Sequence, residues 1–291
     1  MDKELKISEQ LKGNPFGSRF YEHYLHGELE TPSFPDVALK MRMAVQQDRD
    51  MADLVKIINM DPVISAKLIQ VVNSPFYMPM HPITNCLNAI SRLGRKTTRD
   101  LVITFSLKNL VRSEKPVIKK LIQQAWYQSI KVSSIADTLA RLTQKVEAEG
   151  ALLAGLLHNI GALPILTFAN SLPTDAYHPD DLTLCIDELQ GQIGSIVLEH
   201  WEFPEGLRKI PLESSDWLTD TGDTLNLTDI VLLAKYHYFL AAPPGGAELP
   251  LIDTMPAYKK LGNQPLTPEM SLQILQDAKQ QIAETMSFFS T

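Results

Sequence analysis

Two adjacent polar side chains, His158 and Asn159, interrupt an otherwise apolar stretch that reads GLLHNIGAL from residue 155 to residue 163. An imidazole is a common metal ligand, and a carboxylate beside it would add the negative charge that a hard divalent cation needs. Here the second side chain is an amide, which is a neutral and weaker ligand. Two interpretations follow. The pair could be hydrogen-bonded at a buried helix end, since an unpaired buried polar group costs about 1–3 kcal/mol, or it could be the remainder of a metal site.

The familiar catalytic and nucleotide-binding patterns do not occur elsewhere in the sequence. It contains no GxGxxG or P-loop glycine pattern, no GxSxG serine-hydrolase motif and no HExxH zinc motif. The sequence therefore indicates no cofactor.

A short segment at the end of a predicted helix could contact a partner. Asn73 and Ser74 are followed by Phe76 and Tyr77. These residues favour a helix stop with an Asx-type turn. The alternative is a recognition loop, because aromatic and amide groups on a rigid turn make good contact sites.

Four basic side chains gather in the segment SRLGRKTTRD, at residues 91–100. They are Arg92, Arg95, Lys96 and Arg99. A solvated face is the usual reason for such a group. The alternative is a site for an acidic partner, or for a phosphate at the N-terminus of the following helix.

The composition is that of an ordinary globular protein, with 44% hydrophobic and 21% charged residues in 291. The formal net charge is −7, and Lys and Arg are scattered, which argues against a nucleic-acid surface or an anionic membrane surface. No secretory signal opens the sequence, and no apolar run reaches the length of a clean membrane span. We therefore expect a cytoplasmic protein, in which Cys86 and Cys185 are reduced, buried thiols.

The periodic stretches have helical spacing, and no convincing period-two strand occurs. Asp61 followed by Pro62 predicts a helix start, because proline at the first helical position needs no N–H donor there. Gly94 stands where a left-handed helix C-cap is expected. The predicted fold class is all-α.

Several segments, in this order, resemble the HD-related output domain (HDOD) family. The resemblance is carried by TPSFPDVALKM (31–41), IINMDPVISAKLIQVVNSPFY (57–77), ITNCLNAISRLGRKTTRDLV (83–102), AWYQSIKVSSIADTLA (125–140), GLLHNIGAL (155–163) and IGSIVLEHWEFPE (193–205). It implies an HD-like multi-helix bundle with an N-terminal helical subdomain, related to the HD-domain and HD-GYP metal-dependent phosphohydrolases.

The resemblance and the composition together divide the chain into four parts. We expect an N-terminal extension over residues 1–30 and an HDOD domain over 31–240, the latter split into an N-terminal helical part (31–113) and an HD-like part (114–240). A proline-rich loop over 241–267 and a C-terminal helix over 268–291 complete the prediction.

The resemblance also implies which positions would carry the metal ligands of HD enzymes, and this chain departs from the family pattern at almost all of them. The positions are Gln128, His158, Asn159, Gln190 and Lys235. Only the histidine is a metal ligand of the expected kind, and lysine would bring positive charge where a cation should bind. Loss of even one ligand or supporting group can cost about 10–100-fold in metal affinity or activity.

The resemblance therefore implies a non-catalytic signal-transduction module that binds a signalling protein in a bacterial pathway. Neither the identity of that protein nor the oligomeric state follows from the sequence. One alternative is a metal-dependent phosphohydrolase acting on a nucleotide or cyclic dinucleotide, with Glu199, His200 or His237 as unrecognised ligands. Another is a sensor that holds a small ligand in the degenerate metal cavity.

Overall fold

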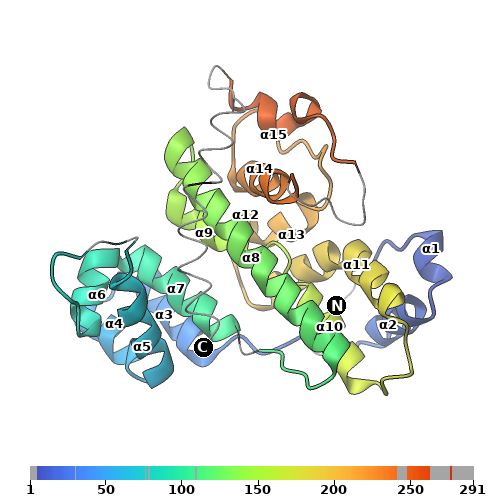
Figure 1. The fold of residues 1–291 in the computed structure, drawn as a ribbon, viewed down its shortest axis with the longest axis horizontal. Coiled ribbons are helices and arrows are strands. Elements are labelled where there is room, and N and C mark those ends of the chain that lie inside the picture. Colours follow the sequence, from blue (N-terminus) through green and yellow to red (C-terminus); the bar gives the residue numbers. More distant parts are fainter. Residues whose placement is uncertain are drawn as a thin grey trace.

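The computed structural model describes residues 5–262, except for 30, 76, 78, 109 and 241–247, together with residue 276. The described residues form helices and connecting segments with no strand, which confirms the all-α prediction (Figure 1). The expected C-terminal helix over 268–291 lies outside the described residues, apart from residue 276.

Two helices precede the region of family resemblance. They are α1 (Glu9–Lys12) and α2 (Pro15–Leu25), and both contact α11 (Pro179–His200). The aromatic rings of Phe16 and Phe20 on α2 are buried and lie within 6 Å of the ring of Phe168. This N-terminal segment is thus packed on the rest of the protein.

A group of five helices forms the N-terminal helical part, seen at the left of Figure 1. They are α3 (Asp36–Gln46), α4 (Met51–Ile58), α5 (Pro62–Val72), α6 (Cys86–Leu93) and α7 (Arg95–Leu107). The Asp61 carboxylate accepts hydrogen bonds from the backbone N–H groups of Val63 and Ile64, at 2.8 and 3.1 Å. The predicted Asp-Pro helix start is therefore confirmed.

The HD-like part is built around one long helix, α8 (Pro116–Thr143). It is followed by α9 (Ala148–Leu157), α10 (Ala162–Ser171) and α11, then by the short helices α12 (Glu205–Arg208) and α13 (Ile210–Glu213), and by α14 (Leu227–Phe239). Helix α8 packs against α9, α10 and α14. Helix α11 packs in turn on α10 and α13.

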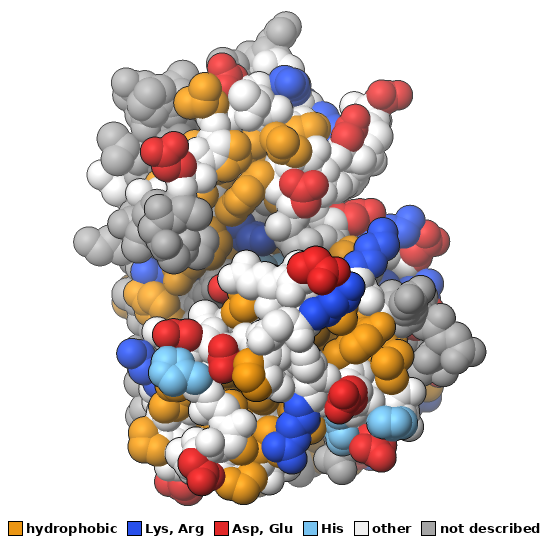
Figure 2. Space-filling view, turned by 90° about the vertical axis from the view of Figure 1, so that its right-hand side faces the viewer, with side chains coloured by type: hydrophobic (Ala, Val, Ile, Leu, Met, Phe, Trp, Pro, Cys, Tyr) orange, Lys and Arg blue, Asp and Glu red, His pale blue; other side chains and the backbone are white. Residues whose placement is uncertain are grey.

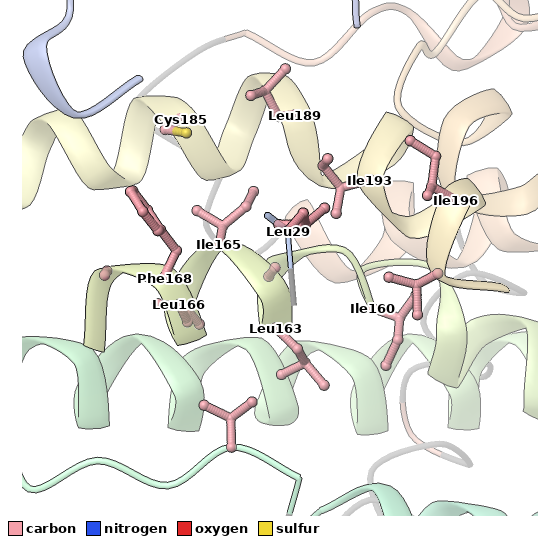
Figure 3. Packing of buried hydrophobic residues seen from close by; sticks show 14 of the residues in the cluster. Leu29, Ile160, Leu163, Ile165, Leu166, Phe168, Cys185, Leu189, Ile193 and Ile196 are labelled. Carbon is pink, nitrogen blue, oxygen red and sulfur yellow. The ribbon is translucent and has the colours of Figure 1, made fainter. Parts of the chain in front are cut away.

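Buried hydrophobic residues form three clusters in the described part of the chain. One lies among α1, α2, α10 and α11, and Figure 3 shows side chains of α10 and α11 meeting in it. A second joins the C-terminal half of α8 to α9 and α14, and a third fills the N-terminal helical part. Cys185 belongs to the first and Cys86 to the third, and both are free thiols, as predicted.

The apolar stretch from Gly150 to Ser171 is long and apolar enough, by length and composition, to cross a membrane. The sequence reading found no such span. In the structure, 89% of its most apolar window is buried inside the protein, and the chain turns at residues 158–161 between α9 and α10. Such burial is typical of core helices, which pass the same test of length and composition.

Two local features differ in detail from the sequence prediction. Gly94 has the expected positive φ of 82°, but its ψ of 161° is extended rather than left-handed helical, because α7 begins at the next residue. Within the proline-rich segment, α15 (Pro256–Lys259) packs on α14, and a short 3-10 helix (η2, Ile252–Thr254) packs on α15. Met255, Ala257 and Leu261 are buried there.

Candidate functional site

Helix α8 and the turn between α9 and α10 bring Gln128 and His158 into contact. The Gln128 Nε2 and His158 Nε2 atoms are 3.3 Å apart, and His158 Nδ1 lies 2.6 Å from the carbonyl oxygen of Gly155. A carbonyl can only accept, so Nδ1 carries the proton and Nε2 accepts from the Gln128 amide. Both ring nitrogens of His158 are therefore occupied by protein groups.

Asn159, the neighbour of this histidine, is equally engaged. Its amide Nδ2 donates to the carbonyl oxygen of Ala125 at 3.0 Å, and its Oδ1 accepts a hydrogen bond from the hydroxyl of Ser129. Asn159 is 5% exposed, and these bonds satisfy the buried amide. The interpretation of His158 and Asn159 as polar groups hydrogen-bonded at a buried helix end agrees with this geometry.

Two glycines allow the surrounding helices to come this close. A Cβ atom on Gly155 would lie 2.5 Å from the Cα of Ser133 on α8. A Cβ atom on Gly161 would lie 2.0 Å from the carbonyl oxygen of Gln190 on α11. The backbone of Gln190 is thus placed against the turn that carries His158.

Lys235 on α14 completes the group. Its Nζ donates to the carbonyl oxygen of Ser214 and lies 5.2 Å from the centre of the Trp217 ring. The side chain is half-buried, and its positive charge is close enough to affect the titration of His158. Four of the five predicted site positions therefore lie together, with Gln190 present through its backbone.

The electrostatic environment opposes further positive charge. Burial lowers the pKa of His158 from 6.5 to about 3, and the Lys235 ammonium contributes to this shift, while the bond to Gly155 opposes it. Burial also lowers the pKa of Lys235 to about 8. At neutral pH the site thus holds a neutral imidazole and an ammonium group.

This set of side chains does not fit a divalent cation. The imidazole nitrogen that would bind metal faces an amide, the position beside it has no carboxylate, and the lysine would repel a cation. In the described part of the chain, no three His, Cys, Asp or Glu residues are placed to hold a metal ion. A cavity beside Asn159, lined by residues such as Trp126 and Leu163, measures about 10 Å³, the space of a single water.

Comparison with known proteins relates this fold to a family. The family model described as the HDOD domain matches residues 31–216. The chain belongs to the HDOD family. No curated protein gave a significant match.

Solved structures with the HDOD-type fold are similar over most of the chain. A candidate metal-dependent phosphohydrolase from Shewanella amazonensis SB2B is 25% identical, with a TM-score of 0.77, covering 94% of this chain and 99% of that one. An HDOD domain protein of unknown function from Geobacter sulfurreducens is 17% identical, with a TM-score of 0.62 over 91% of this chain and 92% of that one. A candidate signal transduction protein from Marinobacter aquaeolei VT8 is 19% identical, with a TM-score of 0.62 over 99% of this chain and 63% of that one.

The additional ligands considered for a hydrolase lie in different places in the HDOD chain. Glu199 and His200 are exposed at the end of α11, and Glu199 is 3.6 Å from Arg208. His237 is buried, and its Nδ1 lies 2.7 Å from the carbonyl oxygen of Leu233.

The turn predicted as a recognition loop is held by internal hydrogen bonds. Asn73 donates to the carbonyl oxygens of Ile69 and Ile83, at 2.8 and 2.7 Å, and accepts from the Ile83 N–H. Ser74 is buried, Tyr77 is partly buried against the core of the N-terminal helical part, and Phe76 lies outside the described residues. Whether this turn contacts a partner remains a prediction.

The four basic side chains of α6 and α7 also have partners within the molecule. The Arg95 guanidinium is 2.9 Å from the Asp48 carboxylate and donates to the Arg49 carbonyl oxygen. The other three contacts are Arg92 with the Tyr77 carbonyl oxygen, at 2.6 Å, Lys96 with Glu147, at 2.9 Å, and Arg99 with the buried Asp100, at 2.6 Å. These cations tie neighbouring elements together, and their role in binding a partner stays a prediction.

Sequence reasoning missed a group of aromatic and basic side chains at the α8–α14 contact. Lys131 Nζ lies 4.3 Å from the centre of the Tyr127 ring and 5.8 Å from that of Tyr238. The spacing of Gln128 and Lys131 on α8, and of Lys235 and Tyr238 on α14, was a signal that could have been used, since residues three apart share a helix face.

Proposed function

We propose that this HDOD chain is a signalling module that acts by binding another protein, without hydrolysis at the former metal site. The observation that carries the proposal is the state of that site. An amide replaces the dyad carboxylate and is bound to Ala125 and Ser129, and a lysine ammonium stands on α14 nearby. Hydrolysis by an HD-type mechanism needs a cation that polarises water, and this set of groups disfavours one.

The surface of the N-terminal helical part supports a binding role. A hollow of about 420 Å³ between α4, α5 and α6 is lined by side chains that can hydrogen-bond to a peptide backbone and by apolar side chains. The lining residues are Val55, Asn59, Ser65, Ile69, Thr84, Asn85, Cys86, Leu87 and Asn88. Leu87 is 47% exposed at this hollow. Partly apolar, amide-rich hollows suit an extended segment of a protein partner.

A pair of matched leucine substitutions tests the binding role. Leu87→Glu places a charge in the hollow, whereas Leu142→Glu changes a leucine of similar exposure, 45%, at the end of α8. We expect affinity capture followed by cross-linking to recover one specific protein with the wild type and with Leu142→Glu, and to lose it with Leu87→Glu. Because both leucines are exposed, neither change should unfold the protein.

Equal capture by the two leucine variants would place the partner elsewhere on the chain. If Asn159→Asp fails to capture the partner while Leu87→Glu still captures it, the partner would instead bind at the former metal site.

The second candidate function is metal-dependent phosphohydrolysis. It is favoured by the likeness to the Shewanella amazonensis protein, whose name gives that activity as a candidate. The two functions are separated by assaying a phosphodiester such as bis(p-nitrophenyl) phosphate with Mn²⁺. Turnover by the wild-type chain that disappears with His158→Gln would support the hydrolase, and absence of turnover would support the binding module.

A further inference from the structure

The Lys235 ammonium carries a charge that no carboxylate of the described residues balances. Among the described residues, its ammonium donates a hydrogen bond to the Ser214 carbonyl oxygen and lies over the face of the Trp217 ring, 5.2 Å from its centre. An ammonium group has three N–H donors, and a half-buried cation is costly unless it meets an anion or enough acceptors. Lys235 therefore has unused capacity to bind an acceptor.

A second polar group beside this lysine also has no partner. Ser214, whose carbonyl oxygen accepts from Lys235, is 1% exposed, and its hydroxyl oxygen makes no hydrogen bond in the described part of the protein. A buried hydroxyl without a partner usually marks a water or ligand that the protein is built to receive. It is an observation independent of the lysine charge.

Aromatic and basic side chains stand near Lys235. The ring centres of Trp217 and Phe239 are 6.2 Å apart, and those of Phe239 and Tyr238 are 4.8 Å apart. Tyr238 follows Lys235 by about one helical turn, and the ammonium of Lys131 on α8 lies over the Tyr127 and Tyr238 rings. Lys131 likewise forms no ion pair with a carboxylate among the residues described. On the face drawn in Figure 2, hydrophobic side chains stand above a hollow that has basic atoms at its base.

We propose that Lys235, with the Trp217 ring beside it, binds a phosphoryl group without hydrolysing it. Lys235 neutralises the anion and donates to its oxygens, as charge-assisted hydrogen bonds require. The second ammonium, of Lys131, adds positive charge at the rim. This inference goes beyond the proposed protein-binding function, which concerns a different site, the hollow between α4, α5 and α6.

The phosphoryl group could belong to free phosphate or to a nucleotide, and the aromatic rings distinguish the two. The face of Trp217 could stack on a base, and such stacking is worth about 1–3 kcal/mol per base in nucleic-acid complexes. A nucleoside monophosphate should then bind more tightly than inorganic phosphate, and Trp217→Leu should remove that difference. Equal affinity for the two would assign the site to phosphate alone.

The test is calorimetric titration of the purified full chain with inorganic phosphate, and separately with adenosine 5′-monophosphate, at low ionic strength. We expect saturable binding at one site in the wild type and about tenfold or greater weakening in Lys235→Met, the loss that one charge-assisted bond represents. Lys119→Met removes an exposed lysine of α8 that forms no ion pair with the described residues, and it should leave affinity within about twofold.

Lys235→Arg controls for folding, because it keeps the positive charge and should retain binding, while circular dichroism reports whether each variant is helical. Two results would overturn the proposal. One is the absence of saturable binding of either probe up to about 10 mM, below which even millimolar affinity would be detected. The other is equal binding by Lys235→Met and the wild type, which would mean that phosphate binds non-specifically to the protein surface.

Discussion

Gly161 follows the His158–Asn159 pair and stands where the start of α10 meets α11. Its φ is −67°, an ordinary value, so it is the lack of a side chain that matters here rather than its conformational freedom. Any Cβ atom would lie 2.0 Å from the Gln190 carbonyl oxygen and 2.4 Å from the Gly194 nitrogen. Both neighbours are backbone atoms, which cannot rotate away as a side chain could.

Gly161→Ala should therefore lower the free energy of unfolding by about 3 kcal/mol, at the upper end of the usual overpacking cost. Gly206→Ala is the matched control, because a Cβ there meets nothing within 4 Å and alanine favours the helix. Chemical denaturation followed by circular dichroism measures both. Equal stability of the two variants would contradict the close approach of α10 and α11.

The buried imidazole of His158 makes stability depend on pH. The folded-state pKa of about 3 lies below the ordinary value of 6.5. Between these two pH values, His158 is therefore protonated in the unfolded chain but neutral in the folded one. Stability should fall as the pH drops below about 6.5, and this contribution should vanish above it.

The measurement is the free energy of unfolding of the wild type and of His158→Gln at pH 7.5 and pH 4.5. Burial lowers the pKa of His237 as well, but that residue is present in both proteins and cancels in the difference. The wild type should lose more stability on acidification than the variant does. A difference between the two proteins that is independent of pH would mean that His158 is not buried as a neutral group.

At the scale of helices, Arg42 of α3 joins the N-terminal helical part to the end of α11. Its guanidinium lies against the rings of both Phe34 and Phe203, at 5.0 and 4.7 Å from their centres, and donates to the Trp201 carbonyl oxygen at 2.7 Å. The Trp201 indole N–H in turn donates to the Pro32 carbonyl oxygen at 2.8 Å. These contacts hold the two parts of the domain in one arrangement.

Arg42→Leu should cost about 2–3 kcal/mol, because it removes a charge-assisted hydrogen bond and two cation–π contacts. Arg19→Leu on α2 changes an exposed arginine and should stay within about 0.5 kcal/mol of the wild type. Thermal unfolding of the two variants provides the comparison. If both shift the midpoint equally, the Arg42 contacts do not connect the two parts.

The sequence predicted local features of these helices better than the contacts between them. Asp61 and Pro62 marked a helix start, because the capping interaction involves only residues three apart. The Arg42–Trp201 bond joins residues 159 positions apart, and no local pattern indicates it. Asn73 shows the same limit, since its amide suits a turn on sequence grounds but its bonds to Ile83 were visible only in three dimensions.

The candidate site was partly predictable for a different reason. The family resemblance located His158 and Gln128, which lie 3.3 Å apart, although they are 30 positions apart in sequence. It also located Lys235, whose charge reaches that histidine. The rings around the lysine, such as that of Trp217, could not be placed, because their position depends on how the 214–222 segment folds over α14.

At the scale of the whole molecule, α15 is fastened to the HD-like part by buried polar contacts. Lys260 Nζ lies 3.1 Å from the fully buried Asp229 carboxylate and 2.7 Å from the Thr221 hydroxyl. Lys145, in the connection between α8 and α9, donates to the carbonyl oxygens of Lys260 and Leu261. The segment 248–262 is thereby held over the start of α14.

Lys260→Met should release this segment, because it leaves the Asp229 carboxylate buried without its ammonium partner, at a cost of about 3–5 kcal/mol. We expect faster hydrogen exchange in residues 248–262, measured by mass spectrometry, and unchanged exchange in α4–α6. Lys259→Met is the control, because Lys259 is exposed and forms no ion pair within the described part of the chain. Uniformly faster exchange in all helices would mean that the contact supports the whole fold rather than one segment.

The central claim concerns the former metal site of this HDOD chain, where an amide and an ammonium group stand in place of ligands. The most direct measurement is the metal content of the purified protein, by elemental analysis after growth with manganese and iron supplied. We predict far less than one bound metal ion per chain, and no gain on adding Mn²⁺ to the purified protein. Tightly held metal at nearly one ion per chain, lost in His158→Gln, would contradict the account and restore the hydrolase.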